Sequence, residues 1–336
     1  FLMDELSARK PEKPSAWGGV APTLSICILT LNAKAYLRDC LRSIAEHTPQ
    51  GFARGEGSAA RHDAALRSQS EGSSPFEYEI IVADNASDDG TLAMLAEEFP
   101  YVRVIRNSAN LGFTKPVNQM LAEARGDFFL LLNPDTLLIE DLFSPMLEWM
   151  RENERVGIAI PKVLNADGSF QRQSRRGEAR PAEVFGYFFR LGRLFPKNRA
   201  LNGYLQSWLP EDEIAEVKAV SGSCMFIRRQ AWQQIGEFDE RFFAYQEDSD
   251  FCLRARKAGW KVMYVPITRI VHYGGEGGSK AQPANSILQW HRSYYLYYRK
   301  HFARDYCFLF NWFFYLMMGA KLVWALVKNL FRKVKK

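Results

Sequence analysis

The 336-residue sequence has few cysteines, and none of them has the spacing of a metal site. They are odd in number, far apart and mostly surrounded by apolar residues: Cys27, Cys40, Cys224, Cys252 and Cys307. This pattern argues against a cysteine metal centre and predicts buried thiols in a reducing compartment.

Two glycine-rich signatures are also missing. No G-x-G-x-x-G motif follows the first predicted strand, which argues against a dinucleotide-binding oxidoreductase. No Gly-rich phosphate loop with a basic signature lies near the N-terminus, which argues against a nucleotidyltransferase. No secretory signal is visible, but the chain begins with Phe1 rather than Met, so targeting at that end stays open.

The sequence has no long basic tract before its last residues, although its formal net charge is +6. A positive balance suits anionic partners such as nucleotide phosphates, acidic lipid headgroups or nucleic acid. The charge alone favours none of these three.

The apolar pattern alternates between strands and helices. Phe128–Leu132 is a run of five apolar residues, which is typical of a strand buried on both faces of a parallel sheet. Further strands are predicted at 23–31, 78–83, 102–105, 156–163, 219–227 and 261–265. Helices are predicted at 34–47, 91–99, 115–125, 140–153, 229–235 and 248–258. This order predicts an α/β fold with a doubly wound, mostly parallel sheet flanked by helices.

Composition divides the chain into three parts. Residues 1–22 form a predicted loose tail, and residues 23–280 form the α/β domain. Within that domain we expect a flexible insertion at 49–76 and an irregular substrate loop or lid at 165–217. Residues 281–336 form a C-terminal helical segment that is aromatic, apolar and basic.

The C-terminal segment predicts membrane association. Residues 306–327 are apolar except for Asn311 and Lys321, and a basic end follows. The stretch is long enough to span a bilayer, but its internal lysine and clustered aromatics equally suit an interfacial helix. Packing on the domain or on a second subunit is the alternative, so a homo-oligomer stays open. We favour contact between the basic end and anionic cytoplasmic lipid.

Polar motifs follow four of the predicted strands. In an open α/β sheet, ligands bind beyond the carboxyl ends of the strands, so these motifs predict a ligand site, although each could simply cap a helix or form a turn. A carboxylate after Leu132 could also hold a divalent cation that bridges two phosphates. The motif residues are Thr30, Asn32, Asp84, Asn85, Asn110, Gly112, Phe113, Asn118, Asn133 and Asp135.

Two further features carry possible chemistry. Glu247 and Asp248 open a predicted helix, where acids suit the helix dipole but where a general base could also lie. His272 lies beyond the predicted strand 261–265 and is either structural or a metal ligand. The aromatic stretch Trp290–Tyr298 either shapes an acceptor site or packs in a core.

Taken in order, these motifs resemble the inverting family 2 glycosyltransferases with the GT-A fold, and most closely the bacterial rhamnosyltransferase-like subgroup. The resemblance covers about residues 23–280. It is carried by TLN, DNASDDG, NLGF, LLNPD, SGSCMFIRR, FDERFFAYQEDSDFCLRARKAGW and the final histidine.

The resemblance implies a role for each motif. Asp248 is the expected catalytic base and Glu247 its neighbour, while Asp135 and His272 are the expected ligands of Mg²⁺ or Mn²⁺. Ser221, Gly222 and Ser223 are expected on the acceptor side. The donor-binding residues implied are Thr30, Asn32, Asp84, Asn85, Asn110, Gly112, Phe113, Asn118 and Asn133.

The chain departs from the family pattern in two places. Asn133 replaces the first acid of the DxD motif, which removes one charge from the metal site. Thr114, Lys115 and Pro116 stand where the family has small residues.

The resemblance implies transfer of a sugar from a nucleotide-sugar donor to a lipid-linked or polysaccharide acceptor in cell-envelope glycan synthesis. The donor expected first is dTDP-rhamnose, then a UDP-sugar. The enzyme would act at the cytoplasmic face of a bacterial plasma membrane, without nucleic acid. The alternatives are a catalytically silent nucleotide-binding scaffold and a nucleotidyltransferase.

Overall fold

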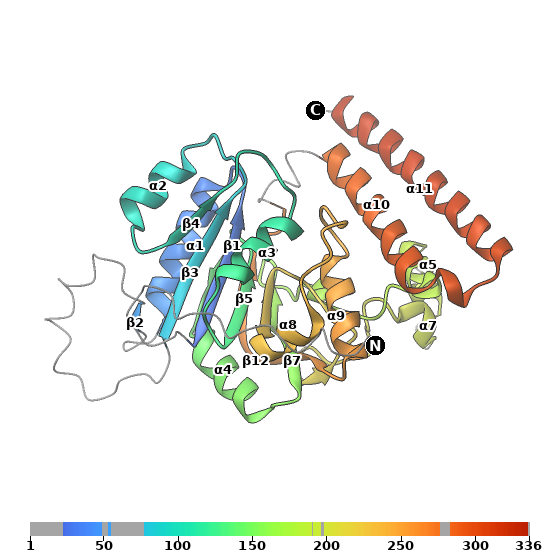
Figure 1. Ribbon diagram of the computed structural model, residues 1–336. Helices are drawn as coiled ribbons and strands as arrows, with labels where there is room; N and C mark the ends of the chain where they lie inside the picture. The colour runs from blue at the N-terminus through green and yellow to red at the C-terminus, as the bar shows by residue number, and fades with distance from the viewer. Residues whose placement is uncertain are drawn as a thin grey trace, which may run out of the picture.

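The computed structural model describes residues 23–48, 53–54, 77–189, 191–195, 198–275 and 283–334 (Figure 1). The predicted tail at 1–22 therefore lies outside the described residues. So does the predicted insertion at 49–76, apart from the two residues of strand β2 (Ala53–Arg54).

A ten-stranded sheet forms the centre of the fold. Eight strands follow the order β2-β3-β1-β5-β11-β7-β12-β6, while β4 pairs with β3 and β9 pairs with β12. One half is parallel and consists of β1 (Leu24–Thr30), β3 (Glu77–Asp84), β4 (Arg103–Arg106) and β5 (Phe128–Leu132). In the other half, β11 (Cys224–Arg228) runs antiparallel to both β5 and β7 (Val156–Leu164). β12 (Lys261–His272) is parallel to β7 and antiparallel to β6 (Thr136–Leu138) and β9 (Ala215–Glu216). The expected doubly wound sheet is confirmed, with antiparallel strands on one side.

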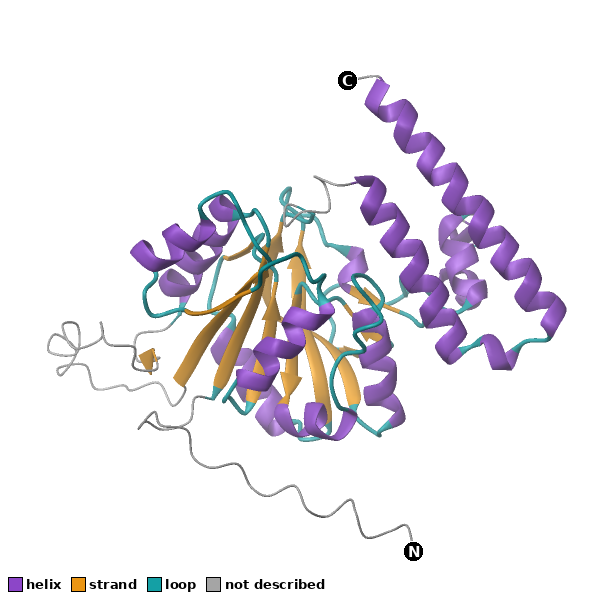
Figure 2. Cartoon of the chain, turned by 45° about the horizontal axis from the view of Figure 1, so that its top comes forward, coloured by secondary structure: helices purple, strands orange, loops and turns teal. Residues whose placement is uncertain are grey.

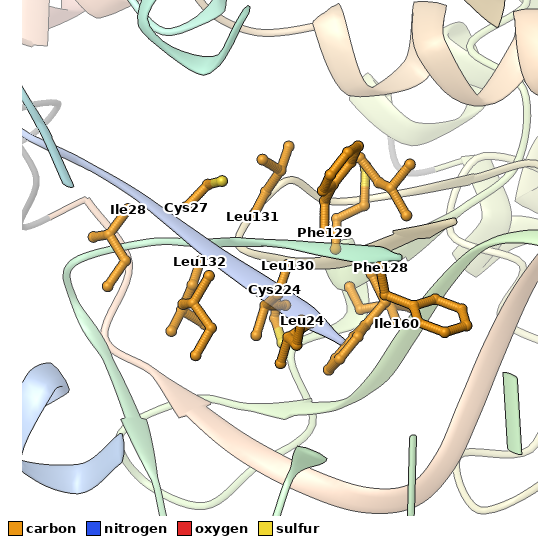
Figure 3. Close-up of a cluster of buried hydrophobic side chains, with 14 of the residues drawn as sticks. Leu24, Cys27, Ile28, Phe128, Phe129, Leu130, Leu131, Leu132, Ile160 and Cys224 are labelled. Atoms are coloured by element: carbon orange, nitrogen blue, oxygen red, sulfur yellow. The ribbon is translucent and has the colours of Figure 1, made fainter. Parts of the chain in front are cut away.

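The central strands are apolar because both faces of the sheet are covered. All five residues of Phe128–Leu132 are buried, and their side chains alternate between the two faces alongside those of β1 (Figure 3). Among the cysteines, Cys27, Cys40, Cys224 and Cys252 are buried free thiols, as expected, whereas Cys307 is exposed.

Helices cover both faces of the sheet (Figures 1 and 2). In α1, Leu37, Leu41 and Ile44 recur at helical spacing and are buried against the strands. The helices around the sheet are α1 (Lys34–His47), α2 (Thr91–Glu98), α3 (Thr114–Glu123), α4 (Phe143–Glu152), α8 (Arg229–Ile235) and α9 (Glu247–Lys257).

Two predicted strands differ from the structure by more than one residue at an end. The predicted strand 219–227 is divided by the turn 221–223. Its first part, β10 (Ala219–Val220), pairs with β8 (Arg175–Arg176) in a separate two-stranded sheet. The predicted strand 261–265 continues through an irregularity between Tyr264 and Arg269 to His272. His272 therefore ends the strand instead of lying beyond it.

The segment 165–217 contains short helices and strands, which corrects the prediction of a wholly irregular loop. It contains a 3-10 helix (Arg172–Ser174), β8, α5 (Pro181–Phe188), α6 (Leu191–Leu194), α7 (Arg199–Asn202) and β9. The guanidinium of Arg175 lies 5.1 Å from the ring centroid of Phe170 and 4.4 Å from that of Tyr264. It also donates hydrogen bonds to the carbonyls of Leu209 and Pro210. These contacts fix the segment to the main sheet.

The C-terminal helices form a second core with this segment. Helix α10 (Pro283–His301) leads through a short 3-10 turn (Ala303–Asp305) to α11 (Phe308–Val334). Tyr294, Tyr297 and Tyr298 of α10 are buried, so these members of the aromatic stretch are core residues. Helix α11 lies at the outer edge of the molecule, with α10 between it and the sheet (Figures 1 and 2).

Candidate active site

Thr30 and Asp84 lie side by side at the ends of β1 and β3, where they are register partners. Both side chains are buried. The Thr30 Oγ1 and Asp84 Oδ1 atoms have no hydrogen-bond partner among the described residues, while Asp84 Oδ2 accepts from the Ser87 amide at 3.0 Å. Buried polar atoms are almost always paired, so these two unpaired oxygens make this edge a candidate ligand site.

The loops after β1 and β3 are joined by reciprocal hydrogen bonds. The Asn32 amide donates to Ser87 Oγ, and Asn32 Oδ1 accepts from the Asp88 amide, both at 2.9 Å. Asn32 and Ala86 have φ values of 49° and 65°, a conformation that costs energy for residues other than glycine. The bonds between the loops hold this backbone in place.

Asn85, Asn110 and Gly112 shape the loop after β4. Asn85 Nδ2 donates to the Gly112 carbonyl at 2.8 Å, and the Gly112 amide donates to Asn110 Oδ1 at 2.9 Å. Gly112 has a φ of +82°, and a Cβ there would lie 2.4 Å from the Phe243 carbonyl oxygen. These residues therefore position the loop against the segment that leads into α9.

Asn118 and Phe113 connect the same region. The Asn118 side chain is saturated by the loop before α9, because its Nδ2 donates to the Phe238 carbonyl and its Oδ1 accepts from the Phe238 amide. The Phe113 amide donates to the Phe243 carbonyl at 2.6 Å. Asn118 is thus brought to the loop before α9 instead of the ends of β1 and β3.

Asp135 and His272 meet because β6 pairs with the end of β12. His272 Nε2 lies 3.2 Å from Asp135 Oδ1 and 3.1 Å from Asn133 Nδ2. His272 Nδ1 lies 2.8 Å from Gln171 Oε1, an atom that can only accept, so Nδ1 donates this hydrogen bond and Nε2 faces Asp135.

This arrangement fits a hard divalent cation. A carboxylate oxygen and an imidazole nitrogen are acceptable ligands for Mn²⁺, and Mg²⁺ usually takes one or two protein carboxylates plus substrate phosphates. Within the described ranges, no three His, Cys, Asp or Glu residues form a closed metal site. The remaining ligands would therefore come from phosphate or water. Gln171, which orients His272, was missed by the sequence analysis.

Asp248 lies in the first turn of α9, after two strained residues. Tyr245 and Gln246 have φ values of 68° and 64° and turn the chain into the helix. Asp248 Oδ1 accepts from the Ser249 amide at 2.6 Å, and Oδ2 accepts from Arg176 at 2.5 Å and from the Gly222 amide at 3.3 Å. The carboxylate is therefore held in one orientation.

Arg176 is the second functional candidate that the sequence analysis did not single out. It is buried, and it also donates to the Val220 carbonyl. Although burial works against its charge, the attraction of Asp248 raises the pKa of Arg176 above its ordinary value. Its only sequence signal is that it lies in a stretch rich in arginine, with Arg172, Arg175 and Arg180 nearby.

Glu247 differs from Asp248 in its surroundings. Burial first, and then the charge of Asp248, raise the pKa of Glu247 to about 8. Its Oε2 atom is buried without a hydrogen-bond partner among the described residues. Glu247 therefore keeps its proton to higher pH than an ordinary glutamate.

The turn formed by Ser221, Gly222 and Ser223 links the two halves of the site. The Asn133 amide donates to the Ser223 carbonyl at 3.0 Å, and the Ser221 and Ser223 hydroxyls lie 2.5 Å apart. A Cβ on Gly222 would lie 3.3 Å from the Phe113 ring. The turn therefore connects the end of β5, near Asp135, to Asp248.

The chain is similar to known sugar transferases in both sequence and fold. Residues 25–211 match the family described as Glycosyl transferase family 2, and residues 128–334 match Glycosyl transferase family group 2. A Mycobacterium tuberculosis protein named N-acetylglucosaminyl-diphospho-decaprenol L-rhamnosyltransferase is 32% identical over 230 residues, which are 65% of this chain and 73% of that protein. Rhamnosyltransferase WbbL of Escherichia coli is 25% identical over 206 residues, 58% of this chain and 73% of that protein.

A solved structure supports the fold assignment. Mannosyltransferase PcManGT from Pyrobaculum calidifontis, solved with GDP-Man and Mn²⁺, superposes with a TM-score of 0.51 at 16% identity. The match covers 95% of this chain and 76% of the mannosyltransferase. The mostly parallel sheet with its flanking helices is thus the GT-A type. The chain is a member of glycosyl transferase family 2, similar to bacterial rhamnosyltransferases.

Proposed function

We propose that the protein is an inverting glycosyltransferase that moves a sugar from a nucleotide-sugar donor to a hydroxyl of a lipid-linked or polysaccharide acceptor. One observation carries the proposal. The turn 221–223 connects Asp248, an oriented carboxylate, with the edge that holds Asp135 and His272. This connection supports a proposed base and a proposed cation site within one region.

The donor proposed first is dTDP-rhamnose, followed by a UDP-sugar. The nucleoside would meet Thr30 and Asp84, whose buried oxygens lack partners among the described residues. The choice of rhamnose follows the name of the M. tuberculosis relative, which also describes a lipid diphosphate acceptor. We carry both over as a proposal for this chain, within synthesis of a bacterial cell-envelope glycan.

In the proposed reaction, Asp248 accepts the proton of the acceptor hydroxyl while the hydroxyl oxygen attacks the anomeric carbon. A bond forms between these two atoms as the bond from the anomeric carbon to the diphosphate breaks, which inverts the anomeric centre. Arg176 and the Gly222 amide hold the carboxylate in position. Asp135 and His272 would hold Mg²⁺ or Mn²⁺, which offsets negative charge on the diphosphate leaving group.

The site of action proposed is the cytoplasmic face of a bacterial plasma membrane. The buried free thiols suit a reducing compartment. The helix α11 would supply the membrane contact, since its residues Phe308–Phe331 are long and apolar enough to cross a membrane. Nucleic acid has no part in the proposed reaction.

Thermal shift with nucleoside diphosphates tests the donor site without needing the acceptor. We expect dTDP, and more weakly UDP, to raise the melting temperature only with Mg²⁺ or Mn²⁺, because a ligand stabilises the folded state that binds it. Asp135→Asn should abolish the part of this rise in melting temperature that depends on the metal. A lack of any shift with dTDP, UDP, GDP and CDP would favour the silent scaffold instead.

A further inference from the structure

Helix α11 exposes an unusually large apolar surface. Residues Phe308–Phe331 are long and apolar enough to cross a membrane, and only 6% of the most apolar window is buried. Of the nineteen large hydrophobic side chains exposed in the described residues, ten lie on this helix: Phe308, Leu309, Trp312, Phe313, Leu316, Val323, Trp324, Val327, Leu330 and Phe331.

The ten side chains form one continuous face. With 3.6 residues per turn, their positions fall within about 160° of arc along about 36 Å of helix. The other exposed positions before Lys328 are Gly319 and Ala320, so no charged side chain interrupts the face between Phe308 and Val327. An apolar surface of this extent marks an interaction site.

The opposite side of α11 is occupied by protein. The ring centroids of Phe314 and Tyr298 lie 4.0 Å apart. Lys321 Nζ lies 3.6 Å from the ring centroid of Phe188, 4.3 Å from that of Trp290 and 3.1 Å from His291 Nε2. The one charge inside the apolar stretch therefore points away from the exposed face.

This packing disfavours a membrane span. If α11 crossed the membrane, α10 would also enter the hydrocarbon, because α10 covers one face of α11. Helix α10 exposes Arg292 and Arg299, and charged side chains in the bilayer centre are costly. A helix lying along the bilayer surface leaves α10 in water and buries only the outer face of α11.

We propose that α11 lies flat on an anionic membrane, with its outer face in the boundary between headgroups and acyl chains. The charges favour a lipid surface over a second copy of the chain. The exposed Lys328 and the following Arg332, Lys333, Lys335 and Lys336 of the sequence would repel the same residues of a copy, but attract acidic headgroups.

Helix α10 connects α11 to helix α9, which carries Asp248. Ser293 Oγ donates to the Ala244 carbonyl at 2.7 Å, next to the strained Tyr245. Asp250 of α9 pairs with His301 at 2.7 Å and with Lys300 at 2.6 Å. The membrane face is thereby fixed relative to Asp248, two residues before Asp250. This inference deepens the proposed action on a lipid-linked acceptor, but its test measures binding instead of transfer.

Vesicle flotation of the full chain tests the docking. We expect at least tenfold stronger binding to vesicles of phosphatidylcholine with phosphatidylglycerol than to phosphatidylcholine alone. Trp312→Glu and Trp324→Glu should each weaken binding by tenfold or more. Ile267→Glu, at an exposed apolar side chain on β12, is the matched control and should bind like the wild type.

Depth measurements separate a flat helix from a span. A fluorophore is attached at Leu309→Cys or Leu330→Cys in a Cys307→Ser background, since the other four cysteines are buried. Quenching by lipids labelled at known depths should place both probes at the same shallow depth. Depths that differ by about 30 Å, the helical rise between the two positions, would mean a span and overturn the proposal. The proposal would also be overturned if the protein failed to bind vesicles and instead formed a dimer that Trp324→Glu dissociates. That result would assign the exposed face of α11 to a second copy of the chain.

Discussion

Arg176 donates to the carboxylate of Asp248 at 2.5 Å, across 72 residues of sequence, and both side chains are almost fully buried. Arg176 comes from β8, in the segment 165–217. The position of the proposed base therefore depends on a segment that the apolar pattern alone assigns to a loop. Removing one member of a buried ion pair leaves the other charge without compensation.

Replacing Arg176 should impair catalysis through Asp248. We expect Arg176→Gln to lower kcat about 100-fold, the effect typical of losing one group that orients charge in an active site. Arg172→Gln, at an exposed arginine of the same segment, should leave kcat unchanged. An unchanged kcat for Arg176→Gln would mean that Arg176 does not position the proposed base.

Gln171 should control metal affinity without touching the metal. Gln171→Ala removes the acceptor that fixes the His272 tautomer. Loss of such an orienting partner typically weakens metal binding by about 10- to 100-fold. Mn²⁺ titration by calorimetry in the presence of dTDP measures this affinity. Gln230→Ala, at an exposed glutamine of α8, serves as the control. Equal affinities for both variants and the wild type would remove His272 from the metal site.

Gly112 should tolerate no side chain. Gly112→Ala places a Cβ 2.4 Å from the Phe243 carbonyl in a backbone with positive φ. Gly168→Ala is the matched control, since Gly168 has a φ of +79° and nothing lies within 4 Å of its added Cβ. We expect a loss of about 1 kcal/mol for Gly168→Ala from backbone strain, and about 2–4 kcal/mol for Gly112→Ala, where overpacking adds to it. Chemical denaturation measures both, and similar losses would show that Phe243 can move away.

Glu183 should make stability depend on pH. Burial first, and then the charge of Glu178, raise the pKa of Glu183 from 4.5 to about 7. The folded chain then retains a proton that the unfolded chain releases between these values. The free energy of unfolding therefore falls as pH rises through this window.

Glu183→Gln removes that titration. The free energy of unfolding of Glu183→Gln, taken relative to that of the wild type, should be about 1–3 kcal/mol higher at about pH 8 than at about pH 5. This range allows for partial exposure of the Glu183 carboxyl. Denaturant midpoints of both proteins at the two pH values measure the change. A constant difference between them would mean that Glu183 ionises normally in the folded protein.

Local pattern was sufficient for the parallel half of the sheet. Leu24–Thr30 and Phe128–Leu132 are apolar on both faces because helices cover both sides of the sheet. A continuous apolar run of this kind can be recognised from the sequence alone. The polar residues after these strands were then placed at one edge by topology alone. Thr30 and Asp84 are neighbours for this reason.

Other features depend on contacts that no local pattern contains. Strand β12 continues to His272, beyond the predicted end at residue 265, past Pro266 and an irregularity before Arg269. Gln171 meets His272 across 101 residues, and Arg176 meets Asp248 across 72. In both cases a polar residue of the segment 165–217 has a partner that only the folded chain reveals.

Sugar transfer by wild-type and Asp248→Asn protein tests the central claim most directly. The assay supplies dTDP-rhamnose, Mg²⁺ and a polyprenyl diphosphate N-acetylglucosamine acceptor, and follows the product by mass spectrometry and NMR. We expect transfer with an inverted anomeric centre by the wild type, and a rate about 10²- to 10⁴-fold lower for Asp248→Asn. Asp212→Asn, at an exposed acid paired with Lys162, should retain full activity. Full activity of Asp248→Asn, or a product with retained configuration, would contradict the account.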